Sequence, residues 1–141
     1  QRRYSIFDRT IEEDGVKSYA AENGIGIIAF SPLVQGMLTT KYLHGIPADS
    51  RIRTDGRFLK ESDITESRLQ QIKELNELAA EGGESLPQMA LAWNLKDSDV
   101  TSVIIGASKP EQIVENCKVL ESEPFTGEHL QRIEGICRGG R

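Results

Sequence analysis

Apolar positions in this chain follow two patterns that alternate along the sequence. Short apolar runs predict β-strands at residues 3–7, 25–30 and 100–105. Longer segments, in which apolar residues recur every three or four positions, predict helices; these are residues 14–23, 66–81, 86–95, the segment that follows Ser108, and 128–138. Strands that alternate with helices are typical of an α/β protein with a parallel sheet and right-handed crossovers.

The same patterns predict which residues are buried. The runs at 25–30 and 100–105 contain few polar residues, so we expect both faces of these strands to be buried. Trp93 lies in an almost wholly apolar helix and is expected to be a core residue. Two later helices carry an apolar stripe expected to face the core: Ile113, Val114, Cys117 and Leu120 in one, and Leu130, Ile133 and Cys137 in the other.

Turn-forming residues mark the ends of these elements. Asp14 and Gly24 stand where the N-terminal and C-terminal caps of the helix at 14–23 belong. Residues 31–64 show no helical or strand period and contain glycines, prolines and charges. A loop of this length inside a compact domain is most often a binding loop or a lid.

Three predicted strands are few for a complete α/β fold. A doubly wound sheet usually has five or six strands, and a (β/α)₈ barrel has eight strands in roughly 250 residues. Three strands would also leave two unpaired sheet edges, which natural proteins avoid. The pattern therefore favours part of a barrel over a finished fold.

Composition narrows the function classes. The 141 residues include 17 Lys and Arg and 22 Asp and Glu, a net charge of −5, which gives no reason to expect nucleic acid or an anionic membrane as partner. No run approaches the roughly 18 apolar residues of a membrane span. The two cysteines, Cys117 and Cys137, form no CxxC pair and predict small core residues in a reducing cytoplasm. The sequence begins with Gln1 instead of Met, and no apolar signal core follows its two N-terminal arginines, so we expect a truncated start.

A phosphate site is predicted after the last strand. The strand at 100–105 passes through Gly106 to Ser108 and then into a helix, whose free N–H groups favour an anion. Gly106 would let the backbone approach a ligand closely, and Ser108 and Lys109 can donate hydrogen bonds. The alternative is that Ser108 only caps its own helix.

The loop after the strand at 25–30 is the second candidate site. It leaves a strand end, where α/β proteins build their sites, and continues into four cations that could clamp a phosphorylated ligand: Lys41, Arg51, Arg53 and Arg57. The alternative is a solvated loop that Asp49 and Asp55 partly neutralise. Phe30 could stack on a planar ring, although a phenylalanine at a strand end is more often core.

Other chemistries find little support. His44 and His129 are far apart and have no cysteine at ligand spacing, so a metal site is not expected; His44 is only a weak candidate for a general base. The chain contains no Gly-x-Ser-x-Gly elbow, no P-loop and no dinucleotide-binding glycine fingerprint.

Several segments together resemble the aldo-keto reductase family. Residues 26–51, which begin GIIAFSPLVQG, resemble the seventh strand and following loop of that family. Residues 103–116, which begin VIIGAS, resemble its eighth strand and following helix; QMALAW at 88–93 resembles the helix between them, and QRRY at 1–4 the sixth strand. Within the family, KYLHGIPADSR at 41–51 is similar to the group of potassium-channel β subunits and L-glyceraldehyde 3-phosphate reductases.

The resemblance implies a fold and a cofactor. The fold is the C-terminal portion of a (β/α)₈ barrel, about strands six to eight with their helices, over residues 1–141. Residues 31–64 would be the cofactor-binding loop and 127–141 the C-terminal helix and tail. The cofactor is NADPH, and the activity is reduction of aldehydes or ketones, including small or phosphorylated aldehydes, by hydride transfer.

The resemblance also implies roles for single residues. Gln1 would hold the nicotinamide carboxamide, and Phe30 would stack on the nicotinamide ring; many relatives have a larger aromatic there, so we expect weaker stacking. The pyrophosphate would lie along Ser31, Pro32, Leu33, Gly36 and Lys41. The adenosine end with its 2′-phosphate would meet Arg51, Ser108 and Gln112, and the adenine Glu115 and Asn116.

The proton donor of the family is missing from this sequence. The chemistry needs an acid, usually a tyrosine, supported by Lys, Asp and His, and these precede the sixth strand in relatives. Tyr4, Tyr19 and Tyr42 do not match the position of the acid. We therefore expect a cofactor-binding part that is inactive alone, within a parent that acts on small carbonyl substrates.

Two other hypotheses remain open. The chain could be a nucleotide-binding module without catalysis, completed by another chain or by pairing with itself as a homo-oligomer, which would cover its open sheet edges. It could also be a piece of another phosphate-binding barrel, since the eighth-strand phosphate site is common in that fold.

Overall fold

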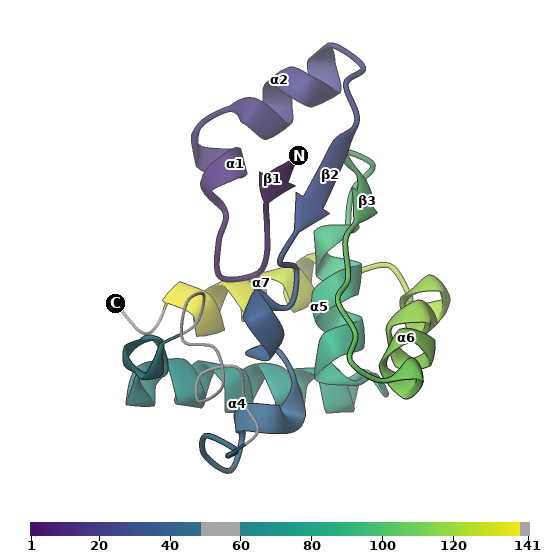
Figure 1. Cartoon of the computed structure of the whole chain (residues 1–141). Coiled ribbons are helices and arrows are strands. Elements are labelled where there is room, and N and C mark those ends of the chain that lie inside the picture. The colour runs from purple at the N-terminus through teal and green to yellow at the C-terminus, as the bar shows by residue number, and fades with distance from the viewer. Residues whose placement is uncertain (49–59, 139–141) are drawn as a thin grey trace.

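The computed structural model describes residues 1–48 and 60–138 (Figure 1). The strands are β1 Arg2–Arg3, β2 Ile27–Phe30 and β3 Val100–Val103. The α-helices are α1 Thr10–Glu13, α2 Val16–Glu22, α4 Glu66–Glu81, α5 Leu86–Asn94, α6 Pro110–Cys117 and α7 Gly127–Arg138. Short 3₁₀ turns lie at Val34–Gly36, Thr40–Tyr42, Glu61–Asp63 and Lys118–Glu121. None of the described helices is long and apolar enough to cross a membrane.

The strands form one parallel sheet. Its order is β1-β2-β3, so β2 is the central strand (Figure 1). Arg2 pairs with Ala29 and Arg3 with Phe30, while Ala29 also pairs with Val103 on its other side. The predicted α/β fold with a parallel sheet is therefore confirmed for the described residues. β1 and β3 each keep one edge that no described strand covers.

The first strand is shorter than the predicted run at 3–7. The backbone N–H of Ser5 donates to the carbonyl of Asp8 at 3.0 Å, and the N–H of Asp8 donates back at 3.2 Å, so the chain turns directly after Tyr4. The turn carries Tyr4 and Ile6 into the core, where both are buried. The strand prediction was wrong beyond Arg3 because these apolar residues pack in a turn, not on a sheet.

Only one face of the sheet is buried among the described residues. Ile27, Ala29 and Val100 are 0–4% exposed, whereas Ile28 and Ile104 are 44% and 46% exposed. The expectation that both faces are buried was therefore wrong for this chain, because its helices cover one face. Side chains alternate between the two faces along each strand, so the strand register shows which residues lie on the uncovered face. We call this face the open face; its residues are Gln1, Arg3, Ile28, Phe30, Ser102 and Ile104.

Of the two predicted caps of α2, only the C-terminal one is confirmed. The prediction of Asp14 as the N-cap was wrong by one position, because Gly15 occupies it, although a carboxylate oxygen of Asp14 accepts the backbone N–H of Val16 at 3.0 Å. Gly24 has φ +65°, and the N–H of Ile25 after it donates to the carbonyl of Ala20 at 2.8 Å. This is the hydrogen bond that closes a helix C-terminus through a left-handed glycine.

The helix α4 packs against both α5 and α7, and all three helices match their predicted spans closely (Figure 1). Each of the first two begins at a hydroxyl: Thr65 accepts the N–H of Arg68 at 3.1 Å, and Ser85 accepts that of Gln88 at 3.3 Å. Trp93 in α5 is 3% exposed, which confirms it as a core residue. On α7, Ile133 is buried, and Leu130 and Cys137 pack against the core, as the stripe predicted.

The apolar stripe of α6 faces solvent, against the prediction. Ile113, Val114 and Leu120 are 51–85% exposed, and Cys117 is exposed. Polar contacts hold this region to α5 instead: the side-chain amide of Gln88 donates to the carbonyl of Lys118 at 3.1 Å and to the hydroxyl of Ser122 at 3.2 Å. The stripe prediction was wrong because α6 turns Asn116, which is 6% exposed, toward the interior.

Candidate functional site

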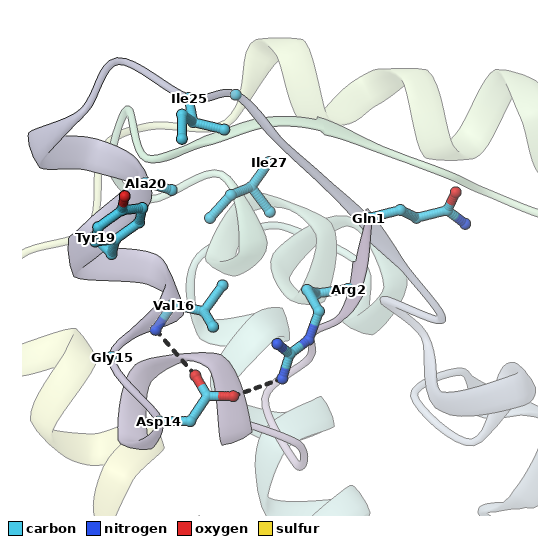
Figure 2. Close-up of a pocket in the computed structure, with 10 residues that line it drawn as sticks. Gln1, Arg2, Asp14, Gly15, Val16, Tyr19, Ala20, Ile25 and Ile27 are labelled. Carbon is cyan, nitrogen blue, oxygen red and sulfur yellow. Dashed lines mark hydrogen bonds and ion pairs between the residues drawn. The ribbon is translucent and has the colours of Figure 1, made fainter.

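Gln1, Arg3 and Phe30 lie together on the open face, beside the candidate site. Arg2 points to the covered side, where it forms an ion pair with Asp14 at 2.6 Å, while Gln1 points away from α2 (Figure 2). Arg3 pairs with Phe30 across the two strands, and its guanidinium carbon lies 5.7 Å from the centroid of the Phe30 ring. An amide, a cation and a half-buried aromatic ring therefore share this face.

The turn after β2 has an unusual backbone. Ser31, Val34 and Gln35 have φ values of 51–58°, a left-handed conformation that residues other than glycine rarely adopt. The side-chain amide of Gln35 donates to the hydroxyl of Ser31 at 3.0 Å, and the N–H of Val34 to the carbonyl of Ser31 at 3.0 Å. Such left-handed residues cost of order 1–3 kcal/mol each and cluster at ligand sites.

Buried residues that follow hold this turn in place. Met37 and Leu38 are 3% and 0% exposed, and the N–H of Leu38 donates to the carbonyl of Leu33 at 3.1 Å. Tyr42, farther along, is also buried. The described part of the predicted loop at 31–64 thus lacks long helices and strands, as expected, and also contributes to the core.

The two candidate loops begin at the same end of the sheet, where β2 and β3 both end. β2 and β3 are parallel neighbours, and the N–H of Ile104 donates to the carbonyl of Ala29 at 2.8 Å. Phe30 and Ser31 therefore begin one loop beside the point where residues 104–109 begin the other. The second loop runs from β3 to α6, on the outer side of α5 (Figure 1).

A side chain already occupies the N-terminus of α6. The side-chain oxygen Oε1 of Gln112 accepts hydrogen bonds from the backbone N–H of Ser108 at 2.8 Å and from the Ser108 hydroxyl at 3.2 Å. It also accepts the backbone N–H of Lys109 at 3.2 Å. The N-cap is Lys109, not Ser108. A Cβ at Gly106 would meet no atom within 4 Å, so the approach to this loop is open. An anion bound at this helix start would replace the Gln112 oxygen as the acceptor of these hydrogen bonds.

The remaining predicted residues differ in accessibility. Lys41 is exposed, while Asn116 is buried. Glu115 is partly exposed and lies 2.7 Å from Lys118, whose hydrogen bond, together with one from Ser85, lowers the pKa of the Glu115 carboxyl. The other cations of the predicted clamp lie outside the described residues: Arg51, Arg53 and Arg57. The two aspartates expected to neutralise them, Asp49 and Asp55, lie outside the described residues as well.

A pocket of about 530 Å³ lies between α2 and the edge of β1 (Figure 2). Val16, Tyr19, Ile25 and Ile27 give it apolar walls, and the paired Arg2 and Asp14 lie at its lower end. Of the predicted cofactor-binding residues that the structure describes, only Gln1 lines it. The pocket follows the uncovered edge of β1, and among the described residues its lining includes none from the turn after β2 or from the loop before α6.

A partly buried polar network, absent from the sequence predictions, fixes the turn after β1. The ammonium of Lys96 donates to the hydroxyl of Tyr4 at 2.6 Å and lies 3.7 Å from the centroid of the Trp93 ring. The Tyr4 hydroxyl donates in turn to the carboxylate of Glu12. Burial, reinforced by Glu12, raises the pKa of Tyr4 far above its usual value, and burial lowers the pKa of Lys96.

Removing the acceptor at the end of this network should destabilise the fold. We expect Glu12→Ala to lower the free energy of unfolding by about 1–3 kcal/mol, because the buried Tyr4 hydroxyl loses its acceptor. Urea denaturation followed by circular dichroism measures the change. Glu13→Ala, on the exposed side of the same helix, is the matched control and should change stability by less than about 0.5 kcal/mol. Equal losses in the two variants would contradict a structural role for the network.

Comparison with known proteins tests the expected family. The aldo/keto reductase family model matches residues 1–138. An L-glyceraldehyde 3-phosphate reductase from Escherichia coli is 44% identical over 137 residues, which are 95% of this chain and 40% of that protein. A probable voltage-gated potassium channel subunit beta from Oryza sativa subsp. japonica is 38% identical over 139 residues, 96% of this chain and 42% of that protein.

A solved structure agrees with this assignment. The glycerol dehydrogenase from Gluconobacter oxydans superposes with a TM-score of 0.75 at 29% identity, over 96% of this chain and 41% of that one. The chain thus spans about two fifths of the length of the relatives it matches. Because one family model accounts for nearly every residue and the fold agrees with a solved relative, the chain belongs to the aldo/keto reductase family.

Proposed function

We propose that this chain is the NADPH-binding C-terminal part of an aldo/keto reductase that reduces aldehydes or ketones to alcohols. One observation carries the proposal: parallel pairing brings Gln1 and Phe30 onto one open face, directly beside the left-handed turn that begins at Ser31. Strand ends of parallel sheets are where α/β enzymes bind their ligands. Family membership supports an oxidoreductase.

The proposed fold is the last part of a (β/α)₈ barrel, about strands six to eight. Two features support it. β1 and β3 have uncovered edges, and the open face exposes Ile28 and Ile104, as expected of a sheet that other strands complete. Residues 31–64 would be the cofactor loop and 127–141 the final helix and tail. We also propose that the protein acts in the cytoplasm.

The residues of the open face suit the nicotinamide end of the cofactor. Bound NADPH would supply the hydride for the carbonyl carbon. The amide of Gln1 can both donate to and accept from the nicotinamide carboxamide. The ring of Phe30, half-buried at the end of β2, can stack on the nicotinamide and leave its other side to the substrate.

The two loops suit the phosphates and the adenosine. The pyrophosphate would lie along the turn after β2, with Lys41 as a cation; its proposed contacts are Ser31, Pro32, Leu33, Gly36 and Lys41. The 2′-phosphate would bind at the start of α6, where N–H groups already hold an oxygen of Gln112, with Arg51 joining from outside the described residues. The proposed contacts at this end are Arg51, Gly106, Ser108, Gln112, Glu115 and Asn116.

Titration of the purified chain with NADPH tests the proposal. Calorimetry should detect saturable binding that weakens in Phe30→Ala and Ser108→Ala, while light scattering reports the mass of the complex. Ser67→Ala, at an exposed position of α4 and outside both loops and the open face, is the matched control. The uncovered edges favour one competing possibility, a self-assembled module; a homo-oligomer that binds no dinucleotide would support it and refute our proposal.

The side chain at the start of α6 offers a charge test. In Gln112→Glu, a carboxylate would hold the same N–H groups more strongly and repel the 2′-phosphate. We expect NADPH binding to weaken about tenfold, and NADH, which lacks that phosphate, to be affected less. Glu111→Gln, one position earlier, removes a charge from the same turn and should not weaken binding. Calorimetry would contradict this assignment if Gln112→Glu weakened NADPH and NADH equally.

A further inference from the structure

Helix α2 ends at an asparagine that a glycine follows. Asn23 is the C-cap residue, and Gly24 has φ +65°. A Cβ on Gly24 would meet no atom within 4 Å, and residues 21–24 are all exposed. In an Asn-Gly pair the next backbone nitrogen can attack the side-chain amide with little obstruction, because glycine has no side chain.

Few contacts hold this pair in place. The side-chain nitrogen of Asn23 donates to the carbonyl of Tyr19 at 2.8 Å, and the backbone N–H of Gly24 donates to the carbonyl of Ala21 at 3.3 Å. The second distance is longer than the usual range of about 2.7–3.2 Å for such a bond. A helix of 7 residues is marginal by itself, and exposed helix ends open at little cost in free energy. The last turn of α2 is therefore expected to open often in the folded protein.

The other end of α2 carries a similar pair that is held in place. Gly15 is also left-handed, with φ +77°, and it follows Asp14. The carboxylate of Asp14 accepts the N–H of Val16 at 3.0 Å and pairs with Arg2 at 2.6 Å (Figure 2). These two contacts hold the pKa of Asp14 below its usual value. An ionised carboxylate resists attack by a nitrogen nucleophile, whereas the amide of Asn23 carries no charge.

We propose that Asn23 is a site of spontaneous deamidation in the folded protein. The backbone nitrogen of Gly24 attacks the side-chain carbon Cγ of Asn23 and forms a C–N bond. The bond from Cγ to the amide nitrogen breaks, and ammonia leaves with the proton of the Gly24 N–H. Water then opens the resulting cyclic imide at either carbonyl, which leaves aspartate or isoaspartate at position 23. Nothing is oxidised or reduced, and water is the only co-reactant.

Either product would weaken the end of α2. A carboxylate at position 23 lies at the negative end of the helix dipole, where negative charge is unfavourable. Isoaspartate also routes the main chain through the former side chain, which adds a backbone carbon before Gly24 and displaces the glycine cap. The N–H of Ile25, which donates to the carbonyl of Ala20 at 2.8 Å, would then lose the bond that closes the helix.

Peptide mapping by mass spectrometry tests the proposal on the folded chain, incubated in mildly alkaline buffer. We expect the peptide that contains Asn23 to gain the mass of deamidation, at a rate within about tenfold of the chain unfolded in guanidinium chloride, since an exposed helix end opens easily. Chromatography separates the isoaspartyl from the aspartyl form. The internal controls are Asn76, Asn94 and Asn116, which lie within helices, precede larger residues and should remain unmodified.

Two variants separate the reaction from its consequence. Asn23→Gln keeps an amide but would have to close a larger, less favourable ring, so its peptide should gain no mass while its circular dichroism stays unchanged. Asn23→Asp reproduces the aspartyl product. In this variant, protection of the Ile25 N–H from hydrogen exchange should fall about 2- to 5-fold, the effect of one unfavourable charge at a helix end. The N–H of Leu69, which donates to Thr65 at the start of α4, should keep its protection.

The proposal is overturned if the folded chain gains no mass during a period in which the unfolded chain reacts completely, because the turn would then protect Asn23. Equal mass gain in Asn23→Gln would place the reaction elsewhere in the peptide and would also overturn it. So would reaction of Asn76, Asn94 or Asn116 as fast as that of Asn23. Mass gain confined to Asn23, with both products present, supports the proposal. The reaction involves no cofactor, so the result is independent of NADPH binding.

Discussion

Replacement of Trp93 by alanine is expected to lower the free energy of unfolding by about 3–5 kcal/mol, the usual cost of truncating a large buried aromatic residue. Trp93 is 3% exposed, and its ring centroid lies 5.1 Å from that of Tyr4. Lys96 and Arg9 lie over its ring, at 3.7 Å and 4.8 Å from the centroid. The substitution would leave a cavity and remove the aromatic face from two cations.

Urea denaturation followed by far-ultraviolet circular dichroism measures this loss without relying on tryptophan fluorescence. Tyr19→Ala is the matched control, because it also truncates an aromatic residue of a helix but at a position that is 63% exposed. We expect that control to cost less than about 1 kcal/mol. Similar losses at Trp93 and Tyr19 would mean that α5 does not form the centre of the core.

The chain alone is expected to bind NADPH but to turn over carbonyl compounds at least about 10²- to 10⁴-fold more slowly than an intact reductase. This range is the usual contribution of a positioned proton donor. The open face carries no tyrosine, histidine or carboxylic acid among the described residues. The hydroxyl of Tyr4 contacts Glu12 and Lys96, and burial, followed by the hydrogen bond to Glu12, raises the pKa of Tyr4. Tyr42 is buried too.

Loss of NADPH absorbance with para-nitrobenzaldehyde measures this turnover. The control is the same chain fused behind the N-terminal three fifths of the Escherichia coli relative, which should regain activity if the missing part supplies the donor. Turnover by the chain alone at the rate of the fusion would contradict the prediction. Tyr19→Phe would then test whether Tyr19 is the donor, since Tyr19 is the most exposed of the three tyrosines.

Much of the fold follows from local pattern. The boundaries of α4, α5 and α7 were predictable because each has a long apolar period with hydroxyl or glycine caps. The pattern was misleading for α6 and for residues 3–7. In α6 an apolar stripe looks the same whether a partner covers it or not, and at 3–7 a buried turn has the composition of a strand.

The candidate site was only partly predictable. The loops after residues 30 and 105 could be identified as sites because they follow apolar strands, and the family resemblance assigned their residues. The contact of Arg3 with Phe30 was missed, because it depends on the register between two strands that lie far apart in the sequence. The role of Gln112 at the start of α6 was also beyond the sequence, because a glutamine side chain can reach many backbone groups.

The sequence by itself determined the element types, the parallel α/β order and the family, because these depend on short-range periodicity and on motifs within single segments. Only the tertiary structure decided which sheet face stays open, that Arg3 lies on Phe30, and that Lys96 reaches Tyr4, 92 positions away. Contacts between distant segments depend on register and packing, which local pattern does not encode.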